Sequence, residues 1–206
     1  KEKNSPLKHS FILLKIFAEH AILATGLKER PIYNIKTDNP NIILAGKVHQ
    51  LIYRFGLTVP NGIIIYTNNN FGWDTAFKLL SLGIEIKAVI DTREDCGFSI
   101  SCPVFRGAQI VKIHSNSNLQ SLKILNNSGK IVKLKTSYLI VSGGFDLNLG
   151  SIMEVIESLS WCSKNLTFIP DRYSKNIDIL SDFNNIFCTN SLLQNTASIS
   201  SKIIRK

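Results

Sequence analysis

The segment from Thr67 to Gly72 has the residue types and position of a phosphate-binding turn. It joins an apolar β-branched run to an amphipathic stretch, as the glycine-rich turn of a dinucleotide-binding βαβ unit does. Against the G-x-G-x-x-G pattern, Thr67 and Asn69 replace the first two glycines, and Gly72 keeps the third. Asparagine tolerates a positive φ better than most residues, so Asn68, Asn69 and Asn70 could still form a tight turn. We therefore predict Thr67, Asn68, Asn69 and Gly72 as cofactor-binding residues, with a turn capped by amide side chains as the alternative.

An acidic residue follows at the distance expected for a ribose contact. Asp91 ends the next apolar run, about twenty residues after the turn, where a carboxylate can hydrogen-bond an adenosine ribose. A carboxylate repels the 2′-phosphate of NADP, so Asp91 favours NAD, although Arg93 nearby weakens this preference. An aspartate that only forms a turn at the end of the strand is the alternative.

Two further pairs of residues stand where predicted strands end. Thr25 and Gly26 end one such strand, and Gly143 and Gly144 end another. Ligands of open α/β sheets bind at the carboxyl ends of strands, so we predict all four as cofactor-binding residues. For Gly143 and Gly144 a plain tight turn is the alternative.

No side chain is predicted to be catalytic or to bind a metal. Neither the four cysteines nor the four histidines have metal-ligand spacing, and no C-x-x-C pair is present. Reduced thiols in a cytoplasmic protein explain the cysteines.

The strands and helices predicted around these residues form an α/β fold. A strand over 62–66, a helix over 72–82 and a strand over 84–90 form a βαβ unit, which predicts a right-handed crossover and a parallel sheet. An antiparallel meander and a closing strand follow. The other predicted elements are strands over 17–23, 109–114, 119–125, 130–134 and 138–141, helices over 44–55 and 152–159, and a weak strand and a helix in the tail from 186.

Composition limits the class of protein. The chain has 206 residues, 44% of them hydrophobic and 19% charged, which is typical of a globular protein with one or two domains. No apolar stretch is long enough to span a membrane. The net charge of +9 suggests polyanion binding, but the lysines are scattered singly along the chain, so we predict no nucleic-acid partner. Because residue 1 is not methionine, we expect the natural chain to begin upstream.

Several stretches resemble the sarcosine oxidase alpha subunit family. The run Tyr66–Asn70 is similar to that family's degenerate T-N-N-D turn, with Asn70 in place of the acidic residue. The other matching stretches are Ile22–Gly26 with Glu29–Pro31, Asn39–Pro40, Leu44–Gly46, Tyr53–Gly56, Leu139–Phe145 and Phe168–Asp171.

The resemblance implies a thioredoxin-reductase-like pair of Rossmann-like dinucleotide-binding domains, one inserted into the other. We then expect residues 1–56 to hold part of the first domain and the connection, 57–145 the inserted NAD-type domain, and 146–206 the return to the first. It also implies an NAD-binding subunit of a hetero-oligomeric oxidase, beside a beta subunit that carries FAD, smaller subunits, and FMN at the subunit interface.

Sarcosine is the substrate that the resemblance implies. A subunit of a related dye-linked proline dehydrogenase or hydrogen cyanide synthase is an alternative. A non-catalytic nucleotide-binding or assembly module is another, in which the asparagine-rich turn binds nothing.

Overall fold

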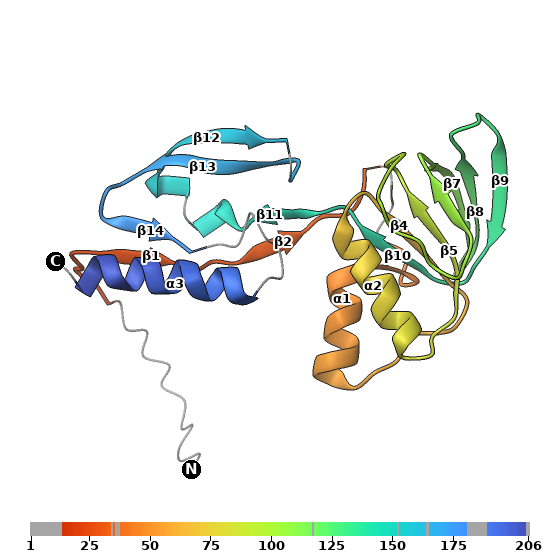
Figure 1. Cartoon of the computed structure of the whole chain (residues 1–206), viewed down its shortest axis with the longest axis horizontal. Helices are drawn as coiled ribbons and strands as arrows, with labels where there is room; N and C mark the ends of the chain where they lie inside the picture. Colours follow the sequence, from red (N-terminus) through yellow and green to blue (C-terminus); the bar gives the residue numbers. More distant parts are fainter. Residues whose placement is uncertain are drawn as a thin grey trace, which may run out of the picture.

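The computed structural model describes residues 14–33, 35, 38–116, 118–151, 153–163, 165–180 and 189–204. The chain forms two parts that are joined by two extended segments (Figure 1). These segments are β2 (Leu27–Glu29) and β11 (Phe145–Leu147), which pair antiparallel with Phe145 opposite Glu29. The chain therefore enters the larger part through β2 and leaves it through β11.

A five-stranded parallel sheet forms the centre of the larger part. All five residues of its middle strand are buried, as expected for a strand covered on both faces. This confirms the predicted α/β Rossmann-like fold. In spatial order the strands are β3 (Ile42–Leu44), β10 (Leu139–Ser142), β4 (Ile63–Thr67), β5 (Ile86–Asp91) and β6 (Val104–Arg106).

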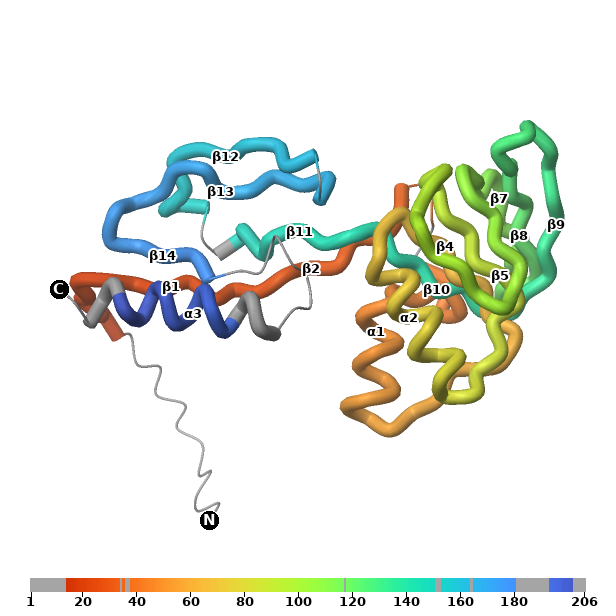
Figure 2. The backbone as a smooth tube through the Cα atoms, viewed as in Figure 1, coloured from red at the N-terminus to blue at the C-terminus, as the bar shows by residue number. Residues whose placement is uncertain are grey.

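Different layers cover the two faces of this sheet (Figures 1 and 2). On one face lie α1 (Ala45–His49), which continues as a π-helical turn over Gln50–Arg54, and α2 (Asn70–Ser81). On the other face lies an antiparallel sheet of β7 (Gln109–Ser115), β8 (Leu119–Leu125) and β9 (Ile131–Lys135).

Strand β4 supplies both hydrophobic cores of the larger part. Ile63 and Ile65 pack into the cluster with the helices, and Ile64 and Tyr66 pack into the cluster with the antiparallel sheet. Successive side chains of a strand point to opposite faces, so one short apolar run serves two layers.

Glycines with a positive φ end both helical segments and form a hairpin turn. Gly56 and Gly83 have φ values of 65° and 76° after the two helical segments, where the left-handed conformation ends a helix. In the hairpin turn between β8 and β9, the Asn126 backbone N–H donates to the carbonyl of Lys130 at 3.0 Å, and Gly129 has φ 74°.

The smaller part contains short strands and one helix. β1 (Ala21–Leu23) pairs in parallel with β14 (Ile177–Ile179). β12 (Ile156–Cys162) pairs antiparallel with β13 (Thr167–Tyr173), and two 3-10 turns, Leu149–Ser151 and Met153–Val155, precede β12. Helix α3 spans Thr189–Ile204.

Two sequence predictions for the smaller part are corrected. The helix predicted over 152–159 is wrong, because Ile156 to Cys162 pair with β13, with the Trp161 and Phe168 rings 5.1 Å apart. Apolar spacing in a short segment cannot exclude a strand whose partner is more distant in sequence. The strand predicted over 17–23 covers only Ala21–Leu23. The strand predicted at the start of the tail falls mainly on residues outside the described part.

The boundary expected at residue 56 lies inside the larger part. β3 pairs with β10, and α1 packs on the same sheet, so residues 42–54 belong with the strands that follow them. The apolar run before α1 was too short to show from the sequence that it joins this sheet.

Candidate dinucleotide-binding site

The carboxyl ends of three adjacent strands bring polar residues side by side. Thr67 of β4 is in register with Asp91 of β5 on one side and with Ser142 of β10 on the other. β4, β5 and β6 follow one another in one direction across the sheet, whereas β10 lies on the opposite side of β4. Crevices at such reversals of strand order are where open α/β sheets bind ligands.

Asn69 caps the helix that begins at this edge. Its Oδ1 accepts the backbone N–H of Gly72 at 3.3 Å, and its own N–H donates to Thr67 Oγ1 at 3.1 Å. Asn69 has φ −149°, and among the described residues the non-glycine residue with a positive φ is Leu166. A tight turn with positive φ, which the sequence allowed at Asn68, Asn69 and Asn70, therefore does not form, and the alternative of a turn capped by amide side chains is the one observed. The chain instead extends into a capped helix start, an arrangement that asparagine favours.

The Asn69 amide also joins the turn to the neighbouring strand. Its Nδ2 donates to the carbonyl of Ser142 at 2.9 Å and to Asn68 Oδ1 at 2.8 Å. The Ser142 hydroxyl donates to Asn69 Oδ1 at 3.1 Å, and the Asn68 N–H donates to the Ser142 carbonyl at 3.3 Å. A side chain thus crosses between β4 and β10, at the position where the usual pattern has a glycine.

Gly72 lets α2 pack closely on β4, which is the role of the third glycine in the G-x-G-x-x-G pattern. A Cβ atom at this position would lie 2.2 Å from Oγ1 and 2.4 Å from Cβ of Thr67. Both residues are buried. Close packing of α2 on β4 therefore requires glycine here.

Asp91 is fully enclosed, and both of its carboxylate oxygens have protein partners. Oδ2 accepts from Trp73 Nε1 at 2.7 Å and from Arg93 Nη2 at 2.8 Å, and Oδ1 accepts from the Arg93 backbone N–H and Nε at 2.9 and 3.1 Å. The Asp91 side chain is 0% exposed. A ribose hydroxyl would have to displace one of these donors, so the observed geometry does not fit the predicted direct contact.

Arg93 is the charged group that this edge presents to solvent. Its side chain is 31% exposed, and Nη1 donates to Asn70 Oδ1 at 2.8 Å, at the first residue of α2. A guanidinium beside the N-terminus of a twelve-residue helix fits an anionic group such as a phosphate. In the sequence, the signal for Arg93 was a basic residue two positions after the end of a predicted strand.

Gly143 and Gly144 hold the chain where it crosses between the two parts. The Gly143 N–H donates to the carbonyl of Arg30 at 3.1 Å, and the Arg30 N–H donates to the carbonyl of Gly144 at 3.0 Å. A Cβ at Gly143 would lie 2.5 Å from the backbone of Pro31, and Gly144 has φ 97°. These glycines let the chain cross closely over residues 30 and 31. The Gly143 backbone is therefore already in contact with these two residues.

Thr25 and Gly26 lie in the smaller part, between β1 and β2. Gly26 has φ 72°, its carbonyl accepts from the Asn148 N–H at 3.2 Å, and the Thr25 hydroxyl is buried without a hydrogen-bond partner. The predicted residues thus form two groups. Thr67, Asn68, Asn69, Gly72 and Asp91 meet with Gly143 and Gly144 at the sheet edge, whereas Thr25 and Gly26 lie beyond β2 and β11 (Figure 1).

Sequence reasoning did not single out Glu29, which lies at the junction between the parts. Its Oε2 accepts the backbone N–H of Gly46, in the first turn of α1, at 2.7 Å, and Oε1 is buried without a partner. Burial raises the pKa of Glu29 to about 7, against the opposing effect of the backbone N–H groups of Gly46 and Ala45. In the sequence, Glu29 stands out only as the acidic residue of the Glu29–Pro31 stretch.

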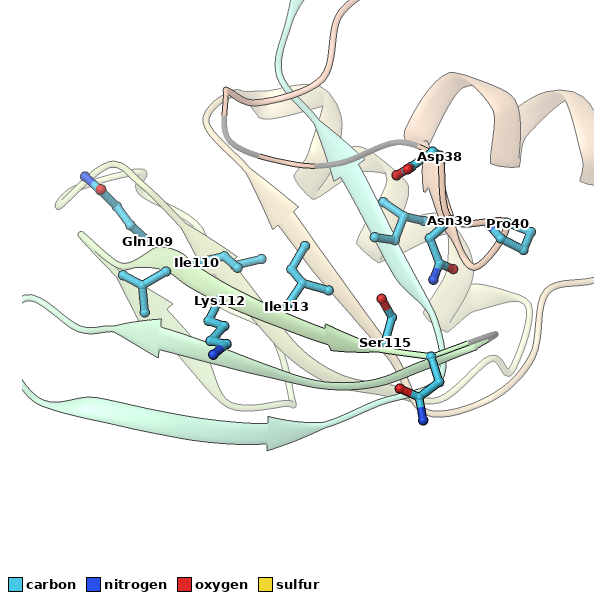
Figure 3. A pocket seen from close by; sticks show the side chains of 11 residues that line it. Asp38, Asn39, Pro40, Gln109, Ile110, Lys112, Ile113 and Ser115 are labelled. Atoms are coloured by element: carbon cyan, nitrogen blue, oxygen red, sulfur yellow. The ribbon is translucent and has the colours of Figure 1, made fainter.

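A groove of about 730 Å³ lies away from this edge (Figure 3). It runs between the segment that leads into β3 and the first strand of the antiparallel sheet, and it contains none of the predicted site residues. Asp38, Asn39 and Pro40 line one side, and Gln109, Ile110 and Ile113 lie along the other.

The described part of the chain contains neither a metal-binding cluster nor a membrane-spanning helix. No group of three or more His, Cys, Asp or Glu side chains is placed there to hold a metal ion. No helix within the described ranges combines the length and the apolar character that crossing a bilayer requires.

Curated relatives agree with the resemblance seen in the sequence. The chain is similar to the sarcosine oxidase subunit alpha of Rhizobium meliloti (strain 1021), with 26% identity over 136 residues, 65% of this chain and 14% of that protein. It is also similar to the sarcosine oxidase subunit alpha of Corynebacterium sp. (strain P-1), with 26% identity over 199 residues, 89% of this chain and 20% of that protein. The chain thus spans about a fifth or less of the length of these relatives. No family model matches the chain.

Solved structures share the fold. L-proline dehydrogenase from P. horikoshii matches with a TM-score of 0.56 and 14% identity, over 79% of this chain and 29% of that chain. Bacillithiol disulfide reductase from Staphylococcus aureus matches with a TM-score of 0.56 and 15% identity, over 78% of this chain and 53% of that chain. An FAD-dependent pyridine nucleotide-disulphide oxidoreductase from Desulfovibrio vulgaris matches with a TM-score of 0.53 and 13% identity, over 80% and 45%. At these identities the likeness establishes the fold.

Proposed function

We propose that this chain is part of a subunit of a flavin-dependent oxidoreductase and that it binds a dinucleotide, NAD, at the carboxyl edge of β4, β5 and β10. The observation that carries the proposal is the meeting of the α2 N-terminus with the crevice between β4 and β10. Backbone N–H groups and the helix dipole make such an end favourable for a pyrophosphate.

The roles of the side chains follow from their contacts. Arg93 would pair with a phosphate oxygen, and Asp91 would act indirectly by holding the Arg93 guanidinium beside Asn70. Asn69 would release the Ser142 carbonyl to admit the ligand. When bound, NAD supplies hydride-transfer chemistry, and the protein supplies its binding and orientation.

The choice of NAD over NADP is a separate part of the proposal. Asp91 gives little preference for NAD, because its carboxylate is enclosed and paired with Arg93. The partly exposed Arg93 guanidinium also suits a 2′-phosphate. Calorimetric titration with NAD and NADP in parallel decides between them, and tighter binding of NADP would contradict the choice of NAD.

Asn69→Gly tests the binding edge most directly. The change restores the second glycine of the pattern and removes the bridge to Ser142, while glycine at an N-cap position costs only a few tenths of a kcal/mol. We expect NAD to bind several-fold more tightly to Asn69→Gly than to the natural chain. Asn148→Gly is the control, because Asn148 is exposed and lies beyond β11, and its NAD affinity should be unchanged.

A non-catalytic assembly module is the second candidate function. The Asn69 bridge and the enclosed Asp91 carboxylate favour it, because both fill positions that a nucleotide would need. This module predicts no saturable heat of binding from NAD or NADP with either the natural chain or Asn69→Gly. That result would end the dinucleotide proposal for this edge.

The proposal for the whole enzyme is a cytoplasmic, sarcosine oxidase-like complex with a beta subunit and smaller subunits. It rests on the two relatives described above, which bear that name, and on the flavoprotein folds. Purifying the natural complex through a tag on this chain tests it. We expect copurifying subunits and a flavin absorption band that bleaches when sarcosine is added without oxygen. A band that responds to proline instead would identify the related dehydrogenase class.

A further inference from the structure

Lysines that are separated in the sequence meet on one face of the antiparallel sheet. In the pairing of β7, β8 and β9, Lys112 lies opposite Lys123, and Lys123 lies opposite Lys133. In the next row on the same face, His114 lies opposite Ser121, and Ser121 lies opposite Lys135. We call Lys112, Lys123, Lys133 and Lys135 the lysine face.

This face points away from the central sheet. The alternate residues of the same strands, such as Ile124, Leu122 and Leu134, pack into the core beneath β4 and β5. Figure 3 shows Lys112 and Ile113 on opposite sides of β7. Lys112, Lys133 and Lys135 are exposed, and Lys123, between its two neighbours, is half-buried.

The opposed lysines lower the stability of the folded chain when no partner neutralises them. Cβ atoms of directly opposed residues in an antiparallel pair are about 5 Å apart, and like charges at that spacing are destabilising. Among the residues that the structure describes, the ion pairs join His20 with Asp178, Arg30 with Asp146 and Arg93 with Asp91, so none neutralises the lysine face. Lys87 of β5 adds a further ammonium group, with Nζ 3.5 Å from the carbonyl oxygen of Lys135.

The pKa of His114 depends on the charge of the lysine face. Its Nε2 is covered and has no hydrogen-bond partner. Desolvation, and then the positive charges of Lys112, Lys123 and Lys133, lower the pKa of His114. An anion that neutralises the lysines would reverse the electrostatic part of this effect and raise the pKa of the imidazole.

We propose that the lysine face is an interaction surface for an acidic region of a partner protein. Because the lysine face is positively charged, a complementary partner surface carries negative charge. Next to the row of three lysines, Leu125 and Ile131 lie opposite each other and are 38% and 65% exposed. An aliphatic pair beside a cationic row suits a protein surface that carries both carboxylates and apolar side chains.

Nucleic acid is the less favoured partner. The three strands contain no Phe, Tyr or Trp that could stack on a base and no arginine that could read a base edge. The proposal is independent of dinucleotide binding, because the lysine face lies on the antiparallel sheet and not at the carboxyl edge described above.

A matched pair of charge reversals tests the proposal on the full 206-residue chain. Lys123→Glu/Lys133→Glu reverses the centre of the face, and Lys47→Glu/Lys78→Glu makes the same charge change on α1 and α2, across the central sheet. The probe is an oligoglutamate peptide, with a DNA duplex and phosphatidylserine vesicles as parallel probes. Removing two attractive pairs and creating repulsive ones should weaken peptide binding at least about tenfold in the first variant. The second variant should change it by less than about twofold.

Two further measurements separate docking from general charge. Adding peptide should move the imidazole NMR signals of His114 and raise its pKa, with no comparable change at His49, which lies at the helix layer. Without any ligand, the single change Lys123→Glu should raise Tm, because it converts the like-charge pairs with Lys112 and Lys133 into opposite-charge pairs. Equal weakening in both variants, or peptide binding without a response of His114, would overturn the proposal. Tighter binding of DNA or vesicles than of the peptide, lost in the first variant, would reassign the face to that partner.

Discussion

The indole Nε1 of Trp73 lies 2.7 Å from Oδ2 of Asp91, and both side chains are 0% exposed. This bond ties the first turn of α2 to the end of β5, and Arg93 completes the pairing of the same carboxylate from the other side. Asp91, which the sequence suggested as a ribose ligand, therefore holds α2 against β5 at the proposed binding edge.

Replacing Trp73 with phenylalanine should weaken this framework. The change removes a donor from a buried carboxylate and leaves a gap against Phe98, whose ring centroid lies 5.4 Å from that of Trp73. We expect Trp73→Phe to lower the free energy of unfolding by about 2 to 4 kcal/mol, measured by urea denaturation. Phe77→Leu, at an exposed ring on the same helix, is the control and should cost much less. A loss equal to that of the control would contradict the role of the bond.

Adding one methyl group at Gly72 should separate α2 from β4. In Gly72→Ala the new Cβ would lie 2.2 Å from Oγ1 and 2.4 Å from Cβ of Thr67, and both residues are buried. We expect a loss of about 1 to 3 kcal/mol in thermal or chemical denaturation. Gly150→Ala is the matched control, since no atom lies within 4 Å of a Cβ at that position. Equal stability of the two variants would contradict the observed packing.

Glu29 should make the stability of the chain depend on pH near neutrality. Its pKa is raised to about 7 in the folded chain from 4.5, so the folded state binds more protons than the unfolded state between these values. This contribution to stability is present below about pH 4.5 and is lost as pH rises through about 7.

Glu29→Gln removes the charge and keeps an oxygen that can accept the Gly46 N–H. We expect the variant to unfold at nearly the same denaturant concentration as the natural chain at pH 5, and to be more stable by about 1 to 2 kcal/mol at pH 8. Glu157→Gln, at an exposed position of β12, should show no such difference. A variant that gains the same stability at pH 5 as at pH 8 would show that titration of Glu29 is not the cause.

The fold was predictable wherever local patterns were sufficient. The apolar run of β4, the amphipathic segment of α2 and the apolar run of β5 predicted a βαβ unit, and periodicity identified each strand of the antiparallel sheet. The order in which β10 inserts between β3 and β4 was not predictable, because nothing in a buried strand's own residues specifies its neighbours. The helix expected over 152–159 failed for a related reason, since its apolar spacing suits a strand once β13 lies beside it.

The sequence by itself determined the chemical types at the binding edge: an amide-rich turn, a glycine for helix packing, and an acidic and a basic residue two positions apart. Only the tertiary structure decided how they are used. It turned Asp91 inward to Trp73 and Arg93, placed Asn69 against Ser142, and gathered scattered lysines into one face. The physical reason is that residue type and spacing set what a side chain can bond to, whereas burial and strand register select which of those partners it meets.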